Sequence, residues 1–530
     1  METTVLIVGA GPTGLALACH LLAIGVPVRI IDKKSGFSTT SKAIGLQYRV
    51  SEILACMGIS DRFLAKGGNP TAVNIYVGRR RLVSLNFKPS GNESGRGAFE
   101  PKAIVIPQSE TEELLGDLLR ERGGRIEWNR EFVVFEQNAH GVASRVRSPD
   151  GSEEQVASKW LVSCEGTHSI IRELAGIKFV GKTYPLAFFL ADVELEGWLQ
   201  HGENYVWMHR DGSFAALPFL RQGRWRLFVD ITDSPPNSGV TLDVIEKLMR
   251  QRTGGHEIRI CNPTWISEFH IQCRMVDRYR NGRVFVAGDA AHAHSPTGGQ
   301  GIVTGIQDAT NLAWKLARVI EGAPQDLLDT YEEERLPKAA EVLKETDRTT
   351  RLLLAPYPFS GLLRDYVVLP IMRSGWVQKK LFAKLAQLHV NYRDCSLSQH
   401  QDAERSLLKA GDRAPDIAFQ DSRSGKITTL FQLLAPMRMI ALVGAETPDK
   451  TRDRIKETLA KAKIETHILA VASNEMSRES DCLIDLHGDF GRLYGMRGQF
   501  LCLVRPDDHI GLFQRPVNHK ALQEYLSLIA

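Results

Sequence analysis

The stretch VLIVGAGPTG, residues 5–14, decides the fold of this chain. Its first four residues form a short apolar strand, and the pattern G-x-G-x-x-G follows at once. The apolar residues 15–22 then continue as the start of a helix, and a second apolar strand, residues 28–31, ends at Asp32. A strand, a glycine turn, a helix and a strand in this order predict a βαβ unit.

Two features of this unit predict a site for a dinucleotide. Gly9, Gly11 and Gly14 let the backbone approach a pyrophosphate at the N-terminus of the helix. Asp32 follows Gly9 by 23 residues, and its carboxylate can there accept hydrogen bonds from a ribose hydroxyl. The alternative is a glycine-rich turn that only packs against its neighbours.

A second glycine turn follows the strand predicted at residues 160–163. The sequence CEGTHS, residues 164–169, leads on to Arg172. Gly166 would permit the close approach of an anionic ligand, and Arg172 would donate charge-assisted hydrogen bonds to it. The alternative is a capped helix start with Ser169 near the N-cap.

The third turn lies in the most specific stretch of the chain. Residues 283–287 predict a strand that ends at Gly288 and Asp289, and a loop rich in proline and glycine leads into a long helix predicted over 301–320. Asp289 is placed to bond a polyol hydroxyl. The free N–H groups at the start of the helix point toward any negative charge ahead of Gly301.

These three motifs, in this order, resemble those of the FAD-dependent aromatic hydroxylases, the single-component class A flavoprotein monooxygenases related to para-hydroxybenzoate hydroxylase and phenol hydroxylase. The resemblance covers about residues 3–345 and includes the helix sequence DATNLAWKL, residues 308–316. The tail, with GDRAP at 411–415 and LVRPD at 503–507, is similar to the thioredoxin-like C-terminal domain of the phenol-hydroxylase branch. The redox cysteines of that domain are absent here, so we expect a structural or dimer-contact role.

The resemblance implies an α/β protein in which a Rossmann-like FAD-binding domain carries an inserted antiparallel β substrate domain and is followed by the thioredoxin-like domain. The β-rich runs that indicate the inserted sheet are 187–195, 204–209, 214–217 and 225–231. The expected boundaries are 1–175 with 275–345 for the FAD-binding domain, 176–274 for the substrate domain, 346–400 for a helical linker region and 405–530 for the C-terminal domain.

The resemblance also implies which residues hold FAD. Gly9, Gly11, Gly14 and Asp32 would bind its adenosine half, Asp289 would bond the ribityl chain, and residues 298–302 would wrap the isoalloxazine. The full set expected to bind FAD is Gly9, Gly11, Pro12, Thr13, Gly14, Asp32, Lys33, Lys42, Gln108, Glu165, Gly288, Asp289, Pro296, Gly299, Gln300, Gly301 and Ile302. Glu165 replaces the usual aspartate of the family, and Lys42 stands where many relatives have arginine.

The activity implied is a monooxygenase reaction. NAD(P)H reduces FAD, O₂ gives a flavin hydroperoxide, and one oxygen atom passes to an aromatic ring. We expect this ring to be phenolic. No acid or base side chain is required because the flavin carries the chemistry, with Pro296 and Gly298 near it. A second G-x-G-x-x-G after a strand is missing, so NAD(P)H is expected as a transient co-substrate only. The alternatives are a Baeyer–Villiger-type oxygenation on the same fold and a non-catalytic FAD-binding sensor.

Substrate residues are sought among the aromatics of the inserted sheet. The inserted sheet supplies Tyr205, Trp207, Phe219 and Phe228, and aromatics at strand spacing are usually core. We select Phe219 and Phe228 because their strands should face the flavin.

Composition excludes several other classes. The 530 residues carry 66 Lys and Arg against 62 Asp and Glu, a net charge of +4, which is too small a bias to indicate nucleic acid or a membrane surface. The chain opens without a secretory signal, and the apolar stretch 352–372 is interrupted and favours a buried helical hairpin over a membrane span. Residues 79–81, three arginines, are read as a solvated loop rather than a phosphate patch.

Cysteine and histidine spacing predicts neither a metal site nor a disulfide scaffold. The eight cysteines contain no C-x-x-C pair, which is typical of a reduced, cytoplasmic protein. His292 and His294 lack further convincing ligands, so no metal is expected. A homodimer is common in the resembled family, which keeps a second copy of the chain among the partners considered.

Overall fold

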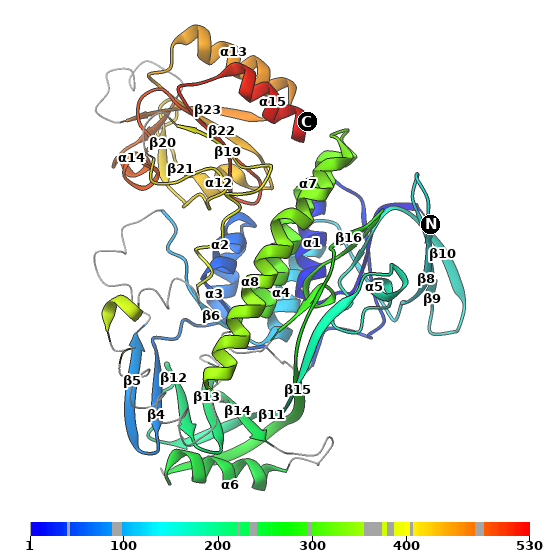
Figure 1. Ribbon diagram of the computed structural model, residues 1–530, viewed down its shortest axis with the longest axis vertical. Helices are drawn as coiled ribbons and strands as arrows, with labels where there is room; N and C mark the ends of the chain where they lie inside the picture. Colours follow the sequence, from blue (N-terminus) through cyan, green and yellow to red (C-terminus); the bar gives the residue numbers. More distant parts are fainter. Residues whose placement is uncertain are drawn as a thin grey trace.

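The computed structural model describes residues 2–39, 43–86, 98–219, 223–232, 241–255, 257–294, 299–353, 371, 374–378, 386–402, 406–471 and 482–530. In this part of the chain, three eight-stranded sheets form the framework of the molecule. Figure 1 shows one sheet at the middle right, a second at the bottom and a third within the upper, C-terminal part. The α/β class that the sequence predicts is confirmed.

The first sheet is the βαβ framework around the glycine turns. Its strand order is β16-β17-β10-β1-β2-β7, and β8 and β9 extend it beside β10. The pairs β1–β2, β1–β10, β10–β17 and β2–β7 are all parallel. Its strands are β1 (Glu2–Val8), β2 (Val28–Asp32), β7 (Ile126–Trp128), β8 (Glu131–Gln137), β9 (Val142–Arg147), β10 (Glu153–Ser163), β16 (Arg280–Asn281) and β17 (Val284–Val286).

The register of this sheet aligns the three glycine turns. Val8 at the end of β1 pairs with Ser163 at the end of β10, and Ser163 pairs with Val286 at the end of β17. Since parallel strands end at a common edge, the segments that follow Val8, Ser163 and Val286 leave the sheet side by side. Residues far apart in sequence thus meet along one edge.

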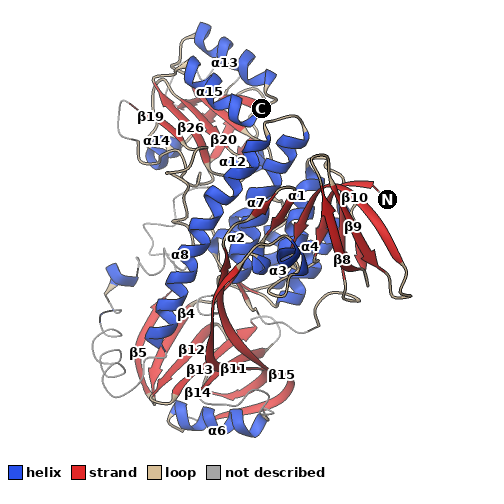
Figure 2. Cartoon of the chain, turned by 45° about the vertical axis from the view of Figure 1, so that its right-hand side comes forward, coloured by secondary structure: helices blue, strands red, loops and turns tan. Residues whose placement is uncertain are grey.

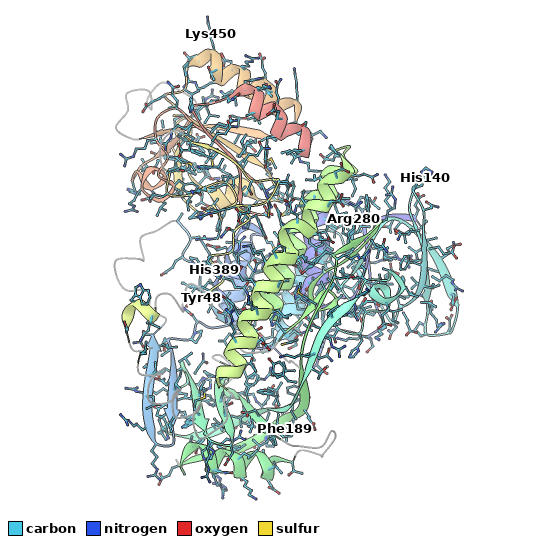
Figure 3. The ribbon with its side chains drawn as sticks, viewed as in Figure 1. Tyr48, His140, Phe189, Arg280, His389 and Lys450 are labelled. Atoms are coloured by element: carbon cyan, nitrogen blue, oxygen red, sulfur yellow. The ribbon has the colours of Figure 1, made fainter. Side chains whose placement is uncertain are left out.

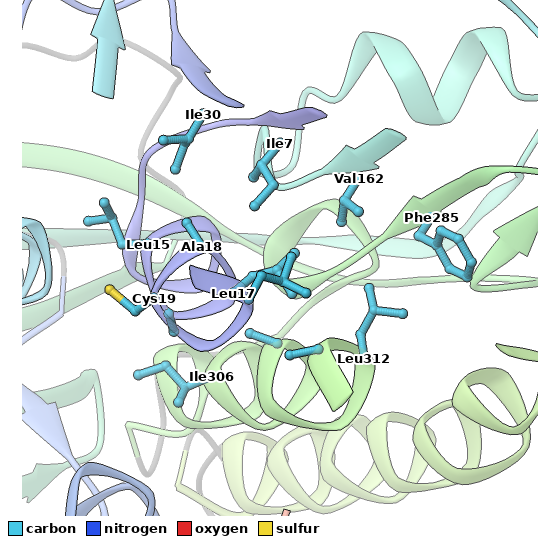
Figure 4. Packing of buried hydrophobic residues seen from close by; sticks show 14 of the residues in the cluster. Ile7, Leu15, Leu17, Ala18, Cys19, Ile30, Val162, Phe285, Ile306 and Leu312 are labelled. Carbon is cyan, nitrogen blue, oxygen red and sulfur yellow. The ribbon is translucent and has the colours of Figure 1, made fainter. Parts of the chain in front are cut away.

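Helices cover this sheet in layers. The helix α1 (Pro12–Ala23) packs directly on it, and the helix α7 (Gly301–Ile320) packs on α1. Figure 4 shows Leu17 and Ala18 of α1 between sheet residues such as Ile7 and helix residues such as Ile306. The helix predicted at 301–320 is confirmed with those bounds.

Proline at the first turn of α1 fits the fixed backbone angle of this residue, and its missing N–H would have no helical partner there.

The remaining elements of this domain surround the same core. These elements are β3 (Gly45–Leu46), α2 (Tyr48–Cys56), α3 (Ser60–Lys66), β6 (Ile104–Val105), α4 (Gln108–Glu121), α5 (Ile170–Leu174), the 3₁₀ helices η1 (Gly288–Ala290) and η2 (Gln325–Leu328), and α8 (Asp329–Leu353).

The second sheet contains the four β-rich runs expected for the inserted domain. Its order is β18-β15-β11-β14-β13-β12-β4-β5, and the helix α6 (Leu242–Thr253) covers one face (Figure 2). Its strands are β4 (Ala72–Val77), β5 (Arg80–Asn86), β11 (Phe179–Gly197), β12 (Glu203–His209), β13 (Gly212–Phe219), β14 (Arg224–Thr232), β15 (Ile258–Val276) and β18 (His292–Ala293).

This sheet is larger than the segment 176–274. The hairpin β4–β5 joins it through a parallel pair between β4 and β12. The interpretation of residues 79–81 as a loop was wrong for Arg80 and Arg81, which begin β5. These two residues pair with β4, and β5 lies at the edge of the sheet. Charged side chains are common on edge strands, so the three arginines did not reveal the strand.

The third sheet lies in the C-terminal region, in the order β19-β26-β25-β22-β23-β24-β20-β21. The apolar stretches near 439–443, 465–471 and 500–504 form β22, β23 and β25. The elements here are β19 (Gln399–Asp402), β20 (Ala418–Asp421), β21 (Ile427–Thr429), α12 (Leu430–Leu434), β22 (Ile440–Gly444), α13 (Asp449–Lys461), β23 (Glu465–Val471), β24 (Leu483–Asp485), α14 (Asp489–Tyr494), β25 (Leu501–Val504), β26 (Ile510–Arg515) and α15 (His519–Ile529).

Among the helices of the described ranges, none combines the length and the apolar character that crossing a bilayer requires. Most of the stretch 352–372, where a helical hairpin was expected, lies outside those ranges.

Candidate active site

The first glycine turn packs too tightly for any side chain at two of its positions. Gly9 has a φ of +107°, and a Cβ added there would lie 2.2 Å from the carbonyl oxygen of Cys164. A Cβ at Gly14 would lie 2.0 Å from the carbonyl oxygen of Gly9. These glycines therefore bring the first turn, the second turn and α1 into direct contact.

Gly11 has different surroundings. A Cβ added there would meet no atom within 4 Å in the described chain, so the backbone at this position faces open space. Gly11 is also the N-cap residue of α1, and no side chain caps the first N–H groups of the helix. The start of α1 therefore offers unpaired donors and a positive dipole end to an anionic group.

Asp32 braces the first turn from the end of β2. Its Oδ2 accepts a hydrogen bond from the Ala10 N–H at 2.8 Å, and its Oδ1 accepts one from the Lys34 N–H at 2.9 Å. The carboxylate is half-buried, and the neighbouring Lys33 is exposed. The sequence analysis predicted only a ribose contact for Asp32 and missed its hydrogen bond to the backbone of the glycine turn.

Glu165 accepts hydrogen bonds from residues around the second turn. Its Oε2 accepts hydrogen bonds from the Ser163 hydroxyl, the Ser169 hydroxyl and the Ile171 N–H at 3.0, 2.6 and 3.1 Å. Ser169 caps α5, as the alternative interpretation of this motif expected. The nearby Cys164 is half-buried, and desolvation of its thiol raises the pKa of that thiol above the ordinary value, so it stays protonated.

Arg172 does not offer its charge to a ligand, which corrects the expectation for this residue. Its Nη2 donates to the Thr167 carbonyl at 2.9 Å, and its Nη1 donates to the Ala290 carbonyl at 3.1 Å. The side chain is buried, and its guanidinium stacks on the ring of Phe179. Arg172 therefore ties the second turn to the third.

The third turn carries an exposed carboxylate and is held by a buried carboxylate of α7. Asp289 is exposed and makes no hydrogen bond or ion pair with any described residue. Asp308 on α7 is fully buried, and its Oδ2 accepts hydrogen bonds from the Gly288 N–H at 3.0 Å and from His292 Nε2 at 2.7 Å. Asp308 thus fixes the backbone that presents Asp289.

The charge of Asp308 is held in place by its neighbours. Burial by itself would raise the pKa of this carboxyl, but the charges of Arg335 and His292 outweigh it and hold the pKa below its usual range. Arg335 Nε donates to Asp308 Oδ1 at 2.7 Å. The sequence placed Asp308 in a family-like helix but did not predict this role.

The N-terminus of α7 approaches the same edge. Gln300 is its N-cap residue, and its Oε1 is buried without a hydrogen-bond partner within the described ranges. Gly299 has a φ of +62°, and the nearest atom to a Cβ there is Gln47 Nε2 at 3.5 Å. A Cβ at Gly301 would lie 3.7 Å from a ring carbon of His294, and Ile302 is half-buried.

The other expected FAD residues are distributed as follows. Gln108 begins α4, is half-buried, and donates from Nε2 to Glu112 Oε1 at 2.9 Å. Thr13 packs where Cβ atoms at Gly288 or Gly305 would clash with it. Lys42, Pro296 and Gly298 lie outside the described residues.

The predicted substrate residues lie on the sheet face that meets the FAD-binding domain. Phe219 is buried, and Phe228 is half-buried. Both pack in one apolar cluster with Leu217 of β13, with Ile44, which directly precedes β3, and with Val105 of β6. The other two aromatics considered, Tyr205 and Trp207, pack on the opposite face, beneath α6.

The same face carries a buried arginine that the sequence analysis missed. Arg226 is fully buried and forms a two-pronged pair with Asp192, with both N–O distances at 2.7 Å. Its guanidinium lies over the rings of Phe219 and Trp265 at 5.2 and 5.3 Å. Its Nη1 has no hydrogen-bond partner in the described part of the chain. Strand alternation could have indicated the face of Arg226, since Phe228 follows it by two residues.

These features fit FAD. A dinucleotide needs close backbone approach, which Gly11 permits, and donors for its pyrophosphate, which α1 presents. It also needs acceptors for its hydroxyl groups, and Asp289 offers a carboxylate without a partner in the described chain. The described residues contain no group of three or more His, Cys, Asp or Glu that could hold a metal ion.

Comparisons with known proteins agree with this geometry. Residues 2–346 match the family described as FAD binding domain. The chain is 34% identical to a flavin-dependent monooxygenase of Mycobacteroides abscessus, over 99% of this chain and all of that protein. It is 29% identical to pentachlorophenol 4-monooxygenase of Sphingobium chlorophenolicum, over 96% and 93% of the two chains. The crystal structure of the flavin-dependent monooxygenase PieE with FAD and substrate superposes with a TM-score of 0.82 at 22% identity, covering 100% and 98%.

The chain therefore belongs to the FAD-binding domain family, and FAD is its cofactor. Within that family it is a flavin-dependent aromatic monooxygenase. The resemblance drawn from the three glycine motifs is confirmed.

Proposed function

We propose that this enzyme uses NAD(P)H and O₂ to hydroxylate a phenolic ring bound between its second sheet and its FAD-binding domain. The observation that carries the proposal is the position of Phe219 and Phe228. They lie on the sheet face that meets Ile44 and Val105 of the FAD-binding domain, and not on the face beneath α6. An aromatic ring held there would lie near the edge where the three glycine turns end.

Arg226 supports a substrate that carries an oxygen acceptor. Its Nη1 is a buried donor without a partner among the described residues, and an unpaired buried donor costs about 1–3 kcal/mol. A phenolic or carbonyl oxygen of a bound ring would satisfy that donor. Asp192 holds the guanidinium in one orientation, so the donor direction is fixed before the substrate arrives.

The roles of the remaining residues follow from their positions. FAD, when bound, supplies the redox chemistry by passing electrons from NAD(P)H to O₂. Gly11 and the start of α1 would bind the pyrophosphate, Asp289 would bond the ribityl chain, and the first turn of α7 would stabilise negative charge on the reduced ring. The apolar cluster at Phe219 would exclude water from the reacting ring.

We propose the domain boundaries given above for the FAD-binding, substrate and C-terminal domains, with the hairpin β4–β5 added to the substrate sheet. A homodimer and a cytoplasmic location belong to the same proposal. All eight cysteines are free thiols, which supports a reducing compartment.

Turnover with a panel of substituted phenols and polycyclic aromatic compounds tests this function. NAD(P)H oxidation and O₂ consumption should rise together with a substrate, and the product should gain one oxygen atom from ¹⁸O₂ on a ring carbon. Oxygen inserted beside a ketone carbonyl would contradict the proposal, and so would the absence of any product while FAD is bound.

Two matched variants locate the substrate. Phe228→Leu should raise the KM for the aromatic substrate by about tenfold, because a lost aromatic contact costs about 1 kcal/mol or more. Phe189→Leu is the control, since Phe189 packs on the other face of the sheet, in the cluster that includes α6 (Figure 3). It should lower the free energy of unfolding and leave the KM unchanged. Equal effects of both variants on the KM would place the substrate elsewhere.

A further inference from the structure

A turn of the C-terminal domain is buried against the FAD-binding domain. Residues 505–509 connect β25 to β26, and the side chains of Arg505, Asp507, Asp508 and His509 are all at most 3% exposed. The FAD-binding and C-terminal regions lie one above the other in Figure 1, and this turn is one of the places where they meet through charged groups.

The contacts of this turn with α8 and α7 are ionic and short. Arg505 pairs with Glu334 of α8 through two N–O contacts of 2.5 and 2.9 Å. Asp507 Oδ2 accepts a hydrogen bond from Asn311 Nδ2 of α7 at 3.0 Å. Lys315 Nζ, also on α7, lies 2.7 Å from Glu334 and is fully buried.

A second ion pair attaches the turn to α2. Arg49 donates to Asp508 through Nη1 at 2.6 Å, and both side chains are buried. Burying charges costs several kcal/mol per ion, and an apolar contact of the same size would hold two domains together as well. Charged groups of the turn are thus paired with partners on α2, α7 and α8, so a change in the relative position of the two domains would leave buried charges without partners.

A chain of contacts leads from this turn to the FAD-binding loop. The ring of His509 lies 4.5 Å from that of Tyr392, and the Arg505 guanidinium lies 5.4 Å from the same ring. The Tyr392 hydroxyl accepts a hydrogen bond from Arg335 Nη1 at 2.9 Å. Arg335 Nε then donates to Asp308 at 2.7 Å.

The last contact of the chain is the backbone of the third glycine turn. Asp308 Oδ2 accepts the hydrogen bond from the Gly288 N–H, directly before the exposed carboxylate of Asp289. Arg335 also donates from Nη2 to the Thr304 carbonyl in the first turn of α7 at 3.2 Å. Arg335 thus holds α7 at Thr304 and Asp308, and Asp308 in turn holds the loop at Gly288.

We propose that the C-terminal domain positions FAD, with Tyr392, Arg335 and Asp308 as the positioning residues between the turn 505–509 and the loop at Gly288. None of the three needs to touch the cofactor. The proposal gives the C-terminal domain, which lacks redox cysteines, a role in the active site. It rests on FAD binding alone and is independent of the substrate identity.

The sharpest test is Tyr392→Phe, which removes only the hydroxyl. Its matched control is Tyr494→Phe, since the buried Tyr494 hydroxyl donates to the Pro415 carbonyl at 2.7 Å within the C-terminal domain. We expect Tyr392→Phe to raise the Kd for FAD by about tenfold, the loss typical of one hydrogen bond to a charged group. We also expect it to shift the visible spectrum and reduction potential of the bound flavin at saturating FAD.

The control should lose similar thermal stability without changing the Kd, spectrum or potential. Wild-type values of all three in Tyr392→Phe would overturn the proposal, and so would equal changes in both variants. The spectrum and potential are measured with the site filled, so a general loss of stability would not move them.

A second pair of variants tests whether the chain of contacts begins at the turn. Arg505→Met removes the first charge, and Arg515→Met removes a comparable buried pair, Arg515 with Asp402 at 2.8 Å, inside the C-terminal domain. Only Arg505→Met should weaken FAD binding. Unchanged FAD binding in that variant would contradict the proposal, and if the variant does not fold, Tyr392→Phe decides.

Discussion

Gly11 differs from the other glycines of the first turn in what surrounds it. Gly9 and Gly14 are required by the protein itself, because a Cβ at either would collide with backbone atoms. Gly11 has free space around it in the described chain, and we propose that its missing side chain leaves room for FAD. The two kinds of glycine should therefore respond differently to substitution.

Gly11→Ala should leave the fold intact and weaken FAD binding. The added methyl would meet only the cofactor, and overpacking a close contact costs about 1–3 kcal/mol, or about tenfold to a hundredfold in Kd. A fluorescence titration with FAD measures this, and the melting temperature of the FAD-free protein should stay near that of the wild type. Gly375→Ala, at another glycine with open surroundings, is the control.

Asp289 presents the second prediction at the scale of single residues. Asp289→Asn should raise the Kd for FAD by about tenfold to a hundredfold, since hydrogen bonds to a charged group contribute about 1.5–3 kcal/mol. The stability of the FAD-free protein should not change, because the carboxylate has no partner within the described ranges. Asp453→Asn, an exposed carboxylate on α13, serves as the control. FAD binding as tight as that of the wild type would exclude the assigned role.

At the scale of single residues, the sequence could predict only features that depend on neighbouring residues in the chain. The glycine pattern and the turn that carries Asp289 could be recognised because both follow from neighbours in the chain, while the role of Asp289 stays a prediction. Arg172 was assigned to a ligand, yet its partners are the carbonyls of Thr167 and Ala290. Charge alone does not specify a partner. The role of Tyr392 depends on contacts with residues 57 and 117 positions away, which no local pattern contains.

At the scale of elements, the crossing of α1 and α7 sets the position of the third turn. A Cβ at Gly305 of α7 would lie 2.3 Å from Thr13 Oγ1 of α1 and 3.2 Å from Gly288 Cα. The close approach of the two helices therefore depends on this one glycine. Figure 4 shows α1 and α7 side by side, with buried side chains of both helices between them.

Gly305→Ala should separate these helices. We expect a loss of about 1–3 kcal/mol in the free energy of unfolding, measured by urea denaturation, together with weaker FAD binding. The double variant Gly305→Ala with Thr13→Ala should recover part of both losses, because it removes the clashing hydroxyl. A double variant no better than the single one would show that Thr13 is not the obstacle.

The elements themselves could be predicted to different degrees. The helix 301–320 was found with its correct bounds because its apolar positions repeat at helical spacing. The strand β15 was missed although residues 269–275 alternate between apolar and polar side chains, because Asn262 and Pro263 interrupt the first half of its 19 residues. The hairpin β4–β5 joins the second sheet through a parallel pair, and sequence order gives no sign of such a distant partner.

At the scale of the whole molecule, charged groups buried between domains make the assembly sensitive to acid. Burial, with the charges of nearby Arg49 and Arg505, lowers the pKa of His509 to about 4, although Asp507 and Asp508 act in the opposite direction. In the unfolded chain this histidine has a pKa of about 6.5. The folded protein therefore keeps His509 neutral in a pH range where the unfolded chain takes up a proton.

The free energy of unfolding should accordingly fall as the pH drops below 6.5. Between pH 7 and pH 5, His509 alone should contribute a loss of about 2 kcal/mol, from 1.36 kcal/mol per pH unit. His509→Asn keeps a polar group near the Asp507 carbonyl and removes the titration. Denaturation curves at both pH values should show a loss smaller by about 2 kcal/mol in this variant. An equal loss in the two proteins would mean that His509 is not held neutral.

The arrangement of the whole molecule depends on three glycine turns meeting at one sheet edge around a single FAD. Titration of the FAD-free protein with FAD, followed by the visible spectrum, measures this most directly. The wild type should saturate at one FAD per chain with a perturbed flavin spectrum, while Gly11→Ala should need a much higher FAD concentration. A wild-type protein that leaves the flavin spectrum unchanged, or a Gly11→Ala variant that saturates at the same concentration as the wild type, would contradict it.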